Sequence, residues 1–140
     1  MVEPIGLVGT LIAIAQVCSK LVSVCYDYHI GVRDAPQDIS RILDEISSVG
    51  AIAQQLVKIS SAEHGSALPV LREMDKKDGP LPKALSELQE LKQSLKLGKP
   101  SSRRRRDLVW PLKRAEADKK LQAIALIKST LQLALAADNA

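Results

Sequence analysis

The sequence predicts an all-α fold: an up-down four-helix bundle with an extra short helix between its second and third long helices. Apolar residues recur at steps of three and four in four long segments, which is typical of amphipathic helices. The seven Gly and seven Pro residues fall mostly outside those segments. The chain has no Phe and only 2% aromatic residues, so its core must be aliphatic, which suits helix-on-helix packing. Its 140 residues are enough for a single domain, expected at 1–140.

The first helix is expected at 4–30 and is the most apolar part of the chain. No residue from Pro4 through Ser19 is charged, but Lys20 interrupts the run before the ~20 residues that a bilayer span requires. Glu3 stands where a signal peptide would carry basic residues. We therefore expect a soluble, cytoplasmic protein whose first helix is buried at rest. Its apolar seam comprises Leu7, Leu11, Ile14, Cys18, Leu21, Cys25 and Tyr28.

The second helix is expected at 35–60. Asp34 is the predicted N-cap, and Gln37 closes a capping box with it. The opposite, polar face carries Glu45, which we expect to face solvent. The predicted core seam comprises Ile39, Ile42, Ile46, Val49, Ala53 and Leu56.

The second half of the chain contains three further predicted helices. A short one lies around 67–74 and is followed by a turn cluster, Lys77–Pro80. A third long helix is expected at 81–97, ended by Gly98 and Pro100, and a fourth at 112–137. The third seam comprises Leu81, Leu85, Leu88, Leu91 or Lys92, and Leu95. The fourth comprises Ala117, Leu121, Ile124, Lys128, Leu131 and Leu135, widened by Leu126, Ile127 and Leu133.

Basic residues concentrate in the loop 99–111 and at the start of the last helix. Between Lys99 and Lys120 nine basic residues face three acidic ones, whereas the whole chain has a net charge of only +4. The run Arg103–Arg106 fits a solvated loop or a contact with anionic lipid, where each basic residue contributes ~1 kcal/mol. Trp110 favours the lipid interpretation, because Trp prefers the membrane interface. Aromatic platforms for single strands are missing, so no nucleic-acid partner is expected.

No residue pattern typical of catalysis or metal binding is apparent. Cys18 and Cys25 lie seven residues apart, roughly 10 Å along a helix, too far for a disulfide. We expect them to be buried free thiols. His29 and His64 show no ligand spacing with these cysteines. The sequence therefore predicts no enzyme activity, no cofactor and no metal.

Several stretches, in their order and spacing, resemble a known family across essentially the full chain. They are Ile5–Leu11, Val32–Pro36, Asp78–Leu81, Leu108–Lys113 and Lys128–Leu135. Together they resemble the fungal N-terminal domain of STAND (NOD-like receptor) proteins, the HeLo-like cell-death family. The resemblance implies a HeLo-like helical bundle, similar to the four-helix bundle of mixed-lineage kinase-like pseudokinases.

The function implied by the resemblance is execution of regulated cell death in fungal non-self recognition. Such a domain oligomerises and permeabilises the plasma membrane through its N-terminal helix. The implied partners are an anionic phospholipid membrane, further copies of the chain, and an upstream STAND receptor or amyloid-motif protein. The protein is expected in the cytoplasm at rest and at the plasma membrane when activated. The membrane-inserting segment would comprise Ile5, Gly6, Leu7, Val8, Gly9, Leu11, Ile12 and Ile14.

Two further expectations concern the contacts with lipid. The expected anionic-lipid-binding residues, chosen on charge alone, are Arg103, Arg104, Arg105, Arg106, Trp110, Lys113 and Arg114. Gly6, Gly9 and Ala13, at about one-turn spacing, would let helices approach closely in lipid, or equally would serve close packing inside the soluble bundle. The alternative function is a non-lytic adaptor module of a STAND receptor, which binds other helical domains and never contacts lipid.

Overall fold

The computed structural model describes residues 6–31, 37–61, 68–96 and 111–138, and within these ranges every regular element is a helix. In chain order the helices are α1 (Gly6–Gly31), α2 (Gln37–Ser61), α3 (Leu68–Met74), α4 (Pro80–Lys96) and α5 (Arg114–Asp138). The prediction of an all-α chain is therefore confirmed for the part of the chain that the structure describes. The predicted N-cap, Asp34, lies outside the described residues.

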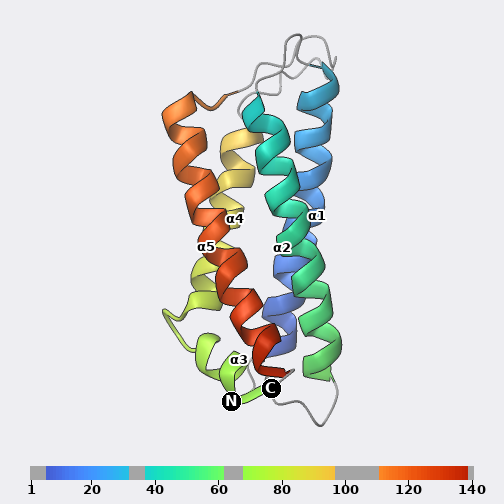
Figure 1. The fold of residues 1–140 in the computed structure, drawn as a ribbon, viewed down its shortest axis with the longest axis vertical. Coiled ribbons are helices and arrows are strands. Elements are labelled where there is room, and N and C mark those ends of the chain that lie inside the picture. The colour runs from blue at the N-terminus through green and yellow to red at the C-terminus, as the bar shows by residue number, and fades with distance from the viewer. Residues whose placement is uncertain (1–5, 32–36, 62–67, 97–110, 139–140) are drawn as a thin grey trace.

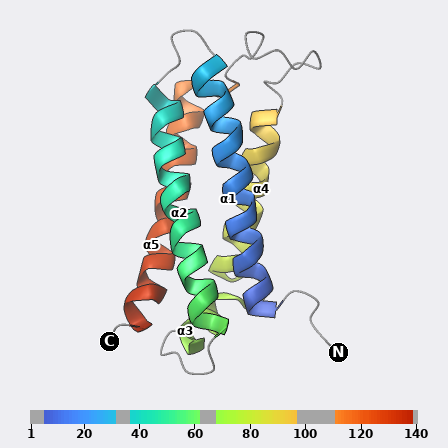
Figure 2. The ribbon, with the colours of Figure 1, turned by 90° about the vertical axis from the view of Figure 1, so that its right-hand side faces the viewer.

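The four long helices lie side by side along the long axis of the molecule, as both views show (Figure 1, Figure 2). The short α3 lies at the end of the bundle where α1 begins and α5 ends (Figure 1). Helix α1 packs most extensively on α2 and also on α4, and α2 packs on α5 as well. Helices α4 and α5 meet only sparsely, so α4 makes fewer contacts with other helices in total than any other long helix.

The core is built almost entirely from aliphatic side chains. Tyr28 is the one aromatic residue among the large, fully buried side chains of the described ranges. The others are Leu11, Ile14, Leu21, Ile39, Ile42, Ile46, Leu56, Leu71, Leu81, Leu88 and Leu91. The seam predicted for α2 is confirmed in full, and the seam predicted for α1 is buried except for Leu7, which is half-buried.

The apolar face predicted for α5 is partly wrong. Leu126 and Leu133 are 68% and 64% exposed, whereas we expected them to widen the buried face. Ala134 is buried instead. The reason is geometric: between Leu121 and Ala136 the apolar residues of α5 lie on more than one side of the helix, so spacing alone does not select the face that meets α2.

The turn between α3 and α4 follows the predicted cluster. Asp78 has a φ of 64°, in the left-handed region that Asp tolerates better than most residues. A Cβ atom on Gly79 would lie 2.5 Å from the main-chain oxygen of Met74, so only glycine fits there. The Gly79 amide donates a hydrogen bond of 2.7 Å to the Lys76 carbonyl, which closes the turn.

Candidate membrane-active helix and its neighbours

Helix α1 buries one face in the core and exposes several large apolar side chains on its other face. Its buried residues are Thr10, Leu11, Ile14, Val17, Cys18, Leu21, Cys25 and Tyr28. Ile12, Tyr26 and Ile30 are 39%, 53% and 48% exposed. The expectation of a buried first helix therefore holds for one face only, and part of its apolar surface already faces outward in the folded bundle.

The predicted membrane-inserting residues are divided between these two environments. Leu11 and Ile14 are fully buried, and Ile12 is exposed. The residues Gly6, Leu7, Val8 and Gly9, in the first turns of the helix, are half-buried. Ile5 lies outside the described residues. The segment is thus part of the core and of the surface at once, and its full transfer into lipid requires α1 to leave α2 and α4.

By length and composition α1 could cross a bilayer. Over an 18-residue window its mean hydropathy is 1.8, and a third of that window is buried. It is the one helix among the described residues that meets this test, which the core helix of a soluble protein can also meet.

Two glycines near this helix serve different purposes. Gly6 has a φ of 61° and open space around the position of a Cβ, so it is required by the backbone at the start of α1 rather than by close packing. Gly50 of α2 is the glycine that brings helices together. A Cβ atom there would lie 3.2 Å from the Cβ of Cys18. The close-packing role considered for Gly6 thus belongs in the folded chain to Gly50, which lies on a helix where sequence analysis did not seek it.

A hydrogen bond joins the end of α1 to the end of α4. The buried Tyr28 hydroxyl donates to the main-chain carbonyl of Leu95. Carbonyl groups in the last turn of a helix have no partner within the helix, so Tyr28 caps one of the orphan acceptors of α4. This contact was not predicted, because it joins residues 67 positions apart.

Positive charges lie close together where α1 meets α4. The pKa of Lys92 on α4 is lowered, first by the charge of Lys20 on α1, then by desolvation and by the charge of Lys96. Sequence analysis noted Lys20 only as the charge that interrupts the apolar run and gave it no neighbour. The α1–α4 contact therefore combines a buried apolar seam with like charges at its edge.

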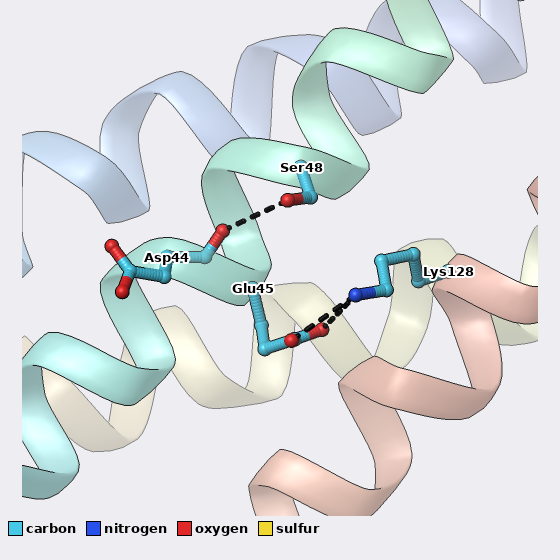
Figure 3. Close-up of polar contacts among 4 residues, drawn as sticks. All are labelled: Asp44, Glu45, Ser48 and Lys128. Atoms are coloured by element: carbon cyan, nitrogen blue, oxygen red, sulfur yellow. Dashed lines mark hydrogen bonds and ion pairs between the residues drawn. The ribbon is translucent and has the colours of Figure 1, made fainter.

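An ion pair joins α2 to α5. The Lys128 ammonium lies 2.9 Å from Oε2 and 3.1 Å from Oε1 of Glu45 (Figure 3). Both side chains are largely removed from solvent, at 30% exposure for Glu45 and 27% for Lys128. The prediction that Glu45 faces solvent is therefore wrong. Lys128 lies on the inward face of α5, as predicted, and its charge is compensated there by Glu45. A weaker contact of 3.9 Å between Arg41 and Asp118 joins the same helices.

The two cysteines are buried free thiols, as predicted. Burial raises the pKa of each, Cys18 and Cys25, to about 12. The reactive species of a thiol is the thiolate, so neither cysteine acts as a nucleophile near neutral pH in the folded chain. Their role is to fill the core of α1.

Of the expected lipid-binding residues, Lys113 and Arg114 lie at the start of α5 with exposed side chains. Arg103, Arg104, Arg105, Arg106 and Trp110 lie outside the described residues. The described part of the chain holds no group of three or more His, Cys, Asp or Glu residues arranged to bind a metal ion.

Comparison of the chain with protein-family models, with curated proteins and with solved structures gave no match.

Proposed function

We propose that the chain is a membrane-targeting cell-death execution domain, in which α1 leaves the bundle and enters the plasma membrane. Permeabilisation follows from the entry of several copies. In this proposal the four long helices form an up-down bundle of the HeLo-like type, and an upstream STAND receptor or amyloid-motif partner gathers the copies. The protein moves from the cytoplasm to the membrane when it is activated.

The observation that carries this proposal is the composition of α1 together with its partial burial. Its first fourteen residues, Gly6–Ser19, contain no charge, and Ile12 is exposed while Leu11 and Ile14 face the core. Exposing a buried Leu or Ile to water costs about 1.5–3 kcal/mol. In a bilayer the apolar side chains on both faces of α1 are out of contact with water. In the soluble bundle only the side chains on one face are.

The basic residues before and at the start of α5 are a second argument for the proposal. Lys113 and Arg114 are exposed, and the neighbouring run Arg103–Arg106 adds four more basic residues. Each basic residue near an anionic membrane surface contributes about 1 kcal/mol of attraction. We propose that these residues hold the domain at the inner leaflet, beside Trp110.

The test is dye leakage from anionic vesicles with a variant that separates insertion from folding. Ile12→Glu places a charge on an exposed position of the proposed inserting segment. A charge at the centre of a membrane helix costs about 2.5–3.5 kcal/mol, so leakage should fall by at least tenfold. Ile12 is 39% exposed, so much of its side chain still packs on the bundle, and the free energy of unfolding is measured beside leakage to separate a loss of stability from a loss of insertion.

The matched control is Ser23→Glu, an exposed position of the same helix beyond Lys20. It adds the same charge outside the proposed inserting segment and should leave leakage near the wild-type level. Equal leakage from wild type, Ile12→Glu and Ser23→Glu would contradict insertion through α1. Absence of leakage from wild-type protein, even when copies are forced together, would contradict the lytic function altogether.

The second candidate is the non-lytic adaptor module. It is favoured by one observation, the large exposed leucines of α5, which would suit contact with another helix. An adaptor should bind its helical partner with fixed stoichiometry. Reversing the charges of Arg103–Arg106 to Glu should then leave cellular localisation unchanged, whereas the membrane function predicts loss of plasma-membrane localisation.

A further inference from the structure

Three lysines lie along one edge of the contact between α1 and α4. Lys20 of α1 and Lys96 of α4 are exposed, and Lys92, one turn before Lys96, is half-buried. Residues four apart on a helix lie on the same face, so Lys92 and Lys96 form a short row on α4.

The register of the two helices places Lys20 on the same edge as this row. Tyr28 of α1 donates to the carbonyl of Leu95 of α4, and the buried Leu21, seven residues before Tyr28, lies on the same line of α1. Helices α1 and α4 run in the same direction (Figure 1, Figure 2). Between two such helices, the residue before a contact residue on one helix and the residue after a contact residue on the other lie on the same side of the contact. Lys20 precedes Leu21, and Lys96 follows Leu95.

The positive charge of this edge has no carboxylate beside it. None of the ion pairs among the described residues includes one of these three lysines. The pKa of Lys92 is lowered first by the charge of Lys20, then by desolvation and by the charge of Lys96, so the charges that act on it are both positive. Asp27, the one acidic residue of α1, lies seven residues after Lys20. The folded chain thus holds three like charges together across two helices, which is unfavourable unless an anion lies between them.

We propose that Lys20, Lys92 and Lys96 form a binding site for a phosphate-bearing anion that bridges α1 and α4. Each ammonium group carries three N–H donors and no acceptor, which suits the oxygens of a phosphate group. Hydrogen bonds between an ammonium and an anionic oxygen are stronger than neutral ones. The row on α4 extends about 6 Å along the helix, so an anion with two linked phosphate groups reaches more of the lysines than a single phosphate does.

The position of the site favours a soluble anion over the headgroup of a lipid. Lys20 lies midway along α1, on the side of the bundle. The residues expected to contact lipid, Lys113 and Arg114, lie at the start of α5, at one end of the bundle (Figure 1). Contact of that end with a membrane does not bring the α1–α4 edge to the membrane surface.

A bound anion should hold α1 and α4 together, because it binds the folded chain and replaces repulsion between the helices with attraction to a shared partner. In the membrane function proposed above, such an anion opposes the release of α1. That consequence rests on the proposed function, whereas binding of the anion does not.

The first measurement is titration calorimetry of the full 140-residue chain with inorganic pyrophosphate, in a phosphate-free buffer at constant ionic strength. We expect saturable binding by the wild-type chain. Lys20→Gln and Lys92→Gln should each weaken it about tenfold or more, because each removes a hydrogen-bond donor that is also a charge. Lys92→Arg keeps the charge and should bind like wild type. The matched control is Lys83→Gln, an exposed lysine of α4 outside the cluster, which should also bind like wild type.

Urea unfolding then tests whether the anion bridges the two helices. Pyrophosphate should raise the urea midpoint of the wild-type chain and of Lys83→Gln, and raise that of Lys92→Gln much less. Without pyrophosphate, Lys92→Gln should be at least as stable as wild type, because it removes repulsion from Lys20 and Lys96. Sodium chloride at the same ionic strength separates screening of the charges from binding.

Three results would overturn the proposal. The first is equal pyrophosphate binding by wild type, Lys20→Gln and Lys92→Gln, which would place the anion elsewhere on the chain. The second is a rise in the urea midpoint that sodium chloride reproduces in full. The third is a wild-type chain that does not bind pyrophosphate but binds phosphatidylcholine vesicles containing phosphatidic acid through Lys92, which would assign the lysines to a lipid headgroup. Leakage is not measured in any of these experiments, so failure of the proposed membrane function leaves the result for this site intact.

Discussion

Tyr28 of α1 donates a buried hydrogen bond to the main-chain carbonyl of Leu95, in the last turn of α4. The bond joins the helix proposed to leave the bundle to the long helix that makes the fewest contacts with other helices. It also places the one large, fully buried aromatic ring of the described core at the α1–α4 contact. The α1–α4 contact thus combines apolar packing with a hydrogen bond that fixes the relative position of the two helices.

Tyr28→Phe should therefore weaken the bundle while leaving its packing intact. The substitution removes the hydroxyl and leaves the Leu95 carbonyl without this donor, which costs about 1–2 kcal/mol. Urea unfolding followed by circular dichroism measures the change. Tyr26→Phe is the matched control. Tyr26 lies on the same helix and is 53% exposed, so this variant should unfold like the wild-type protein. Equal effects at the two positions would contradict a specific role for the Tyr28 hydroxyl.

Gly50→Val should destabilise the contact between α1 and α2. Even the Cβ atom of a side chain at position 50 would lie 3.2 Å from the Cβ of Cys18, and the two further methyl groups have to displace α1. Overpacking of this kind costs about 1–3 kcal/mol. Ala51→Val is the control, since Ala51 is exposed and the change costs only the helix propensity of Val, up to about 0.7 kcal/mol. Chemical denaturation of both variants gives the comparison, and a Gly50→Val protein as stable as Ala51→Val would show that the helices are not in close contact there.

The Glu45–Lys128 ion pair should show measurable coupling in a double-mutant cycle. Because both side chains are roughly 30% exposed, solvent screens the pair, and we expect a coupling energy of about 0.5–1 kcal/mol. The cycle uses Glu45→Gln, Lys128→Met and the double variant, each measured by urea unfolding. Salt should reduce the coupling. As a reference, Lys76 and Glu73 pair at 2.9 Å with 66% and 72% exposure, and a cycle on that pair should give a smaller value.

The buried cysteines should make the fold less stable in alkaline solution. Burial holds the pKa of Cys18 and Cys25 at about 12 in the folded chain, against an ordinary value of 9.0. Below about pH 8 both states keep the proton and the thiols add no pH dependence. Between pH 9 and 12 the unfolded chain binds fewer protons than the folded chain, so stability falls as pH rises.

The expected loss from about pH 8 to about pH 10 is roughly 1.4 kcal/mol per thiol. Cys25→Ala removes one of the two contributions, so its unfolding free energy should fall less steeply over this interval than that of wild type. Parallel slopes for the two proteins would contradict the assignment. Independently, a thiol reagent at neutral pH should label neither cysteine until the chain unfolds, because both thiols are buried out of reach of the reagent in the folded chain.

Much of the fold could be predicted because the apolar face of α2 is unambiguous and the turn before α4 has local signals. In α2 every residue of the predicted seam, from Ile39 to Leu56, is fully buried. The polar residues there leave only one possible apolar face. The turn at Asp78 and Gly79 could be predicted as well, since its signals are local.

Prediction failed where the outcome depends on another helix. The apolar residues of α5 between Leu121 and Ala136 lie on more than one side of the helix, so spacing did not identify Leu126 and Leu133 as exposed. Glu45 and Lys128 lie 83 residues apart, and nothing local to either predicts their pairing. The same limit applied to the candidate site: the uncharged front of α1 is visible in the sequence, whereas its division between core and surface is set by α2 and α4.

Helices α4 and α5 make few contacts with each other, and this determines which helix should separate from the bundle first. Helix α1 packs less extensively on α4 than on α2, so local fluctuations should detach α4 before they separate α1 from α2. Amide hydrogens of α4 should therefore exchange with solvent ahead of those in the middle of α1 and α2, as hydrogen-exchange mass spectrometry would measure. Because α4 covers the side of α1 that holds Tyr28, its detachment uncovers α1 while α2 still holds it. Separation of α4 is therefore the first step by which this side of α1 becomes accessible to solvent.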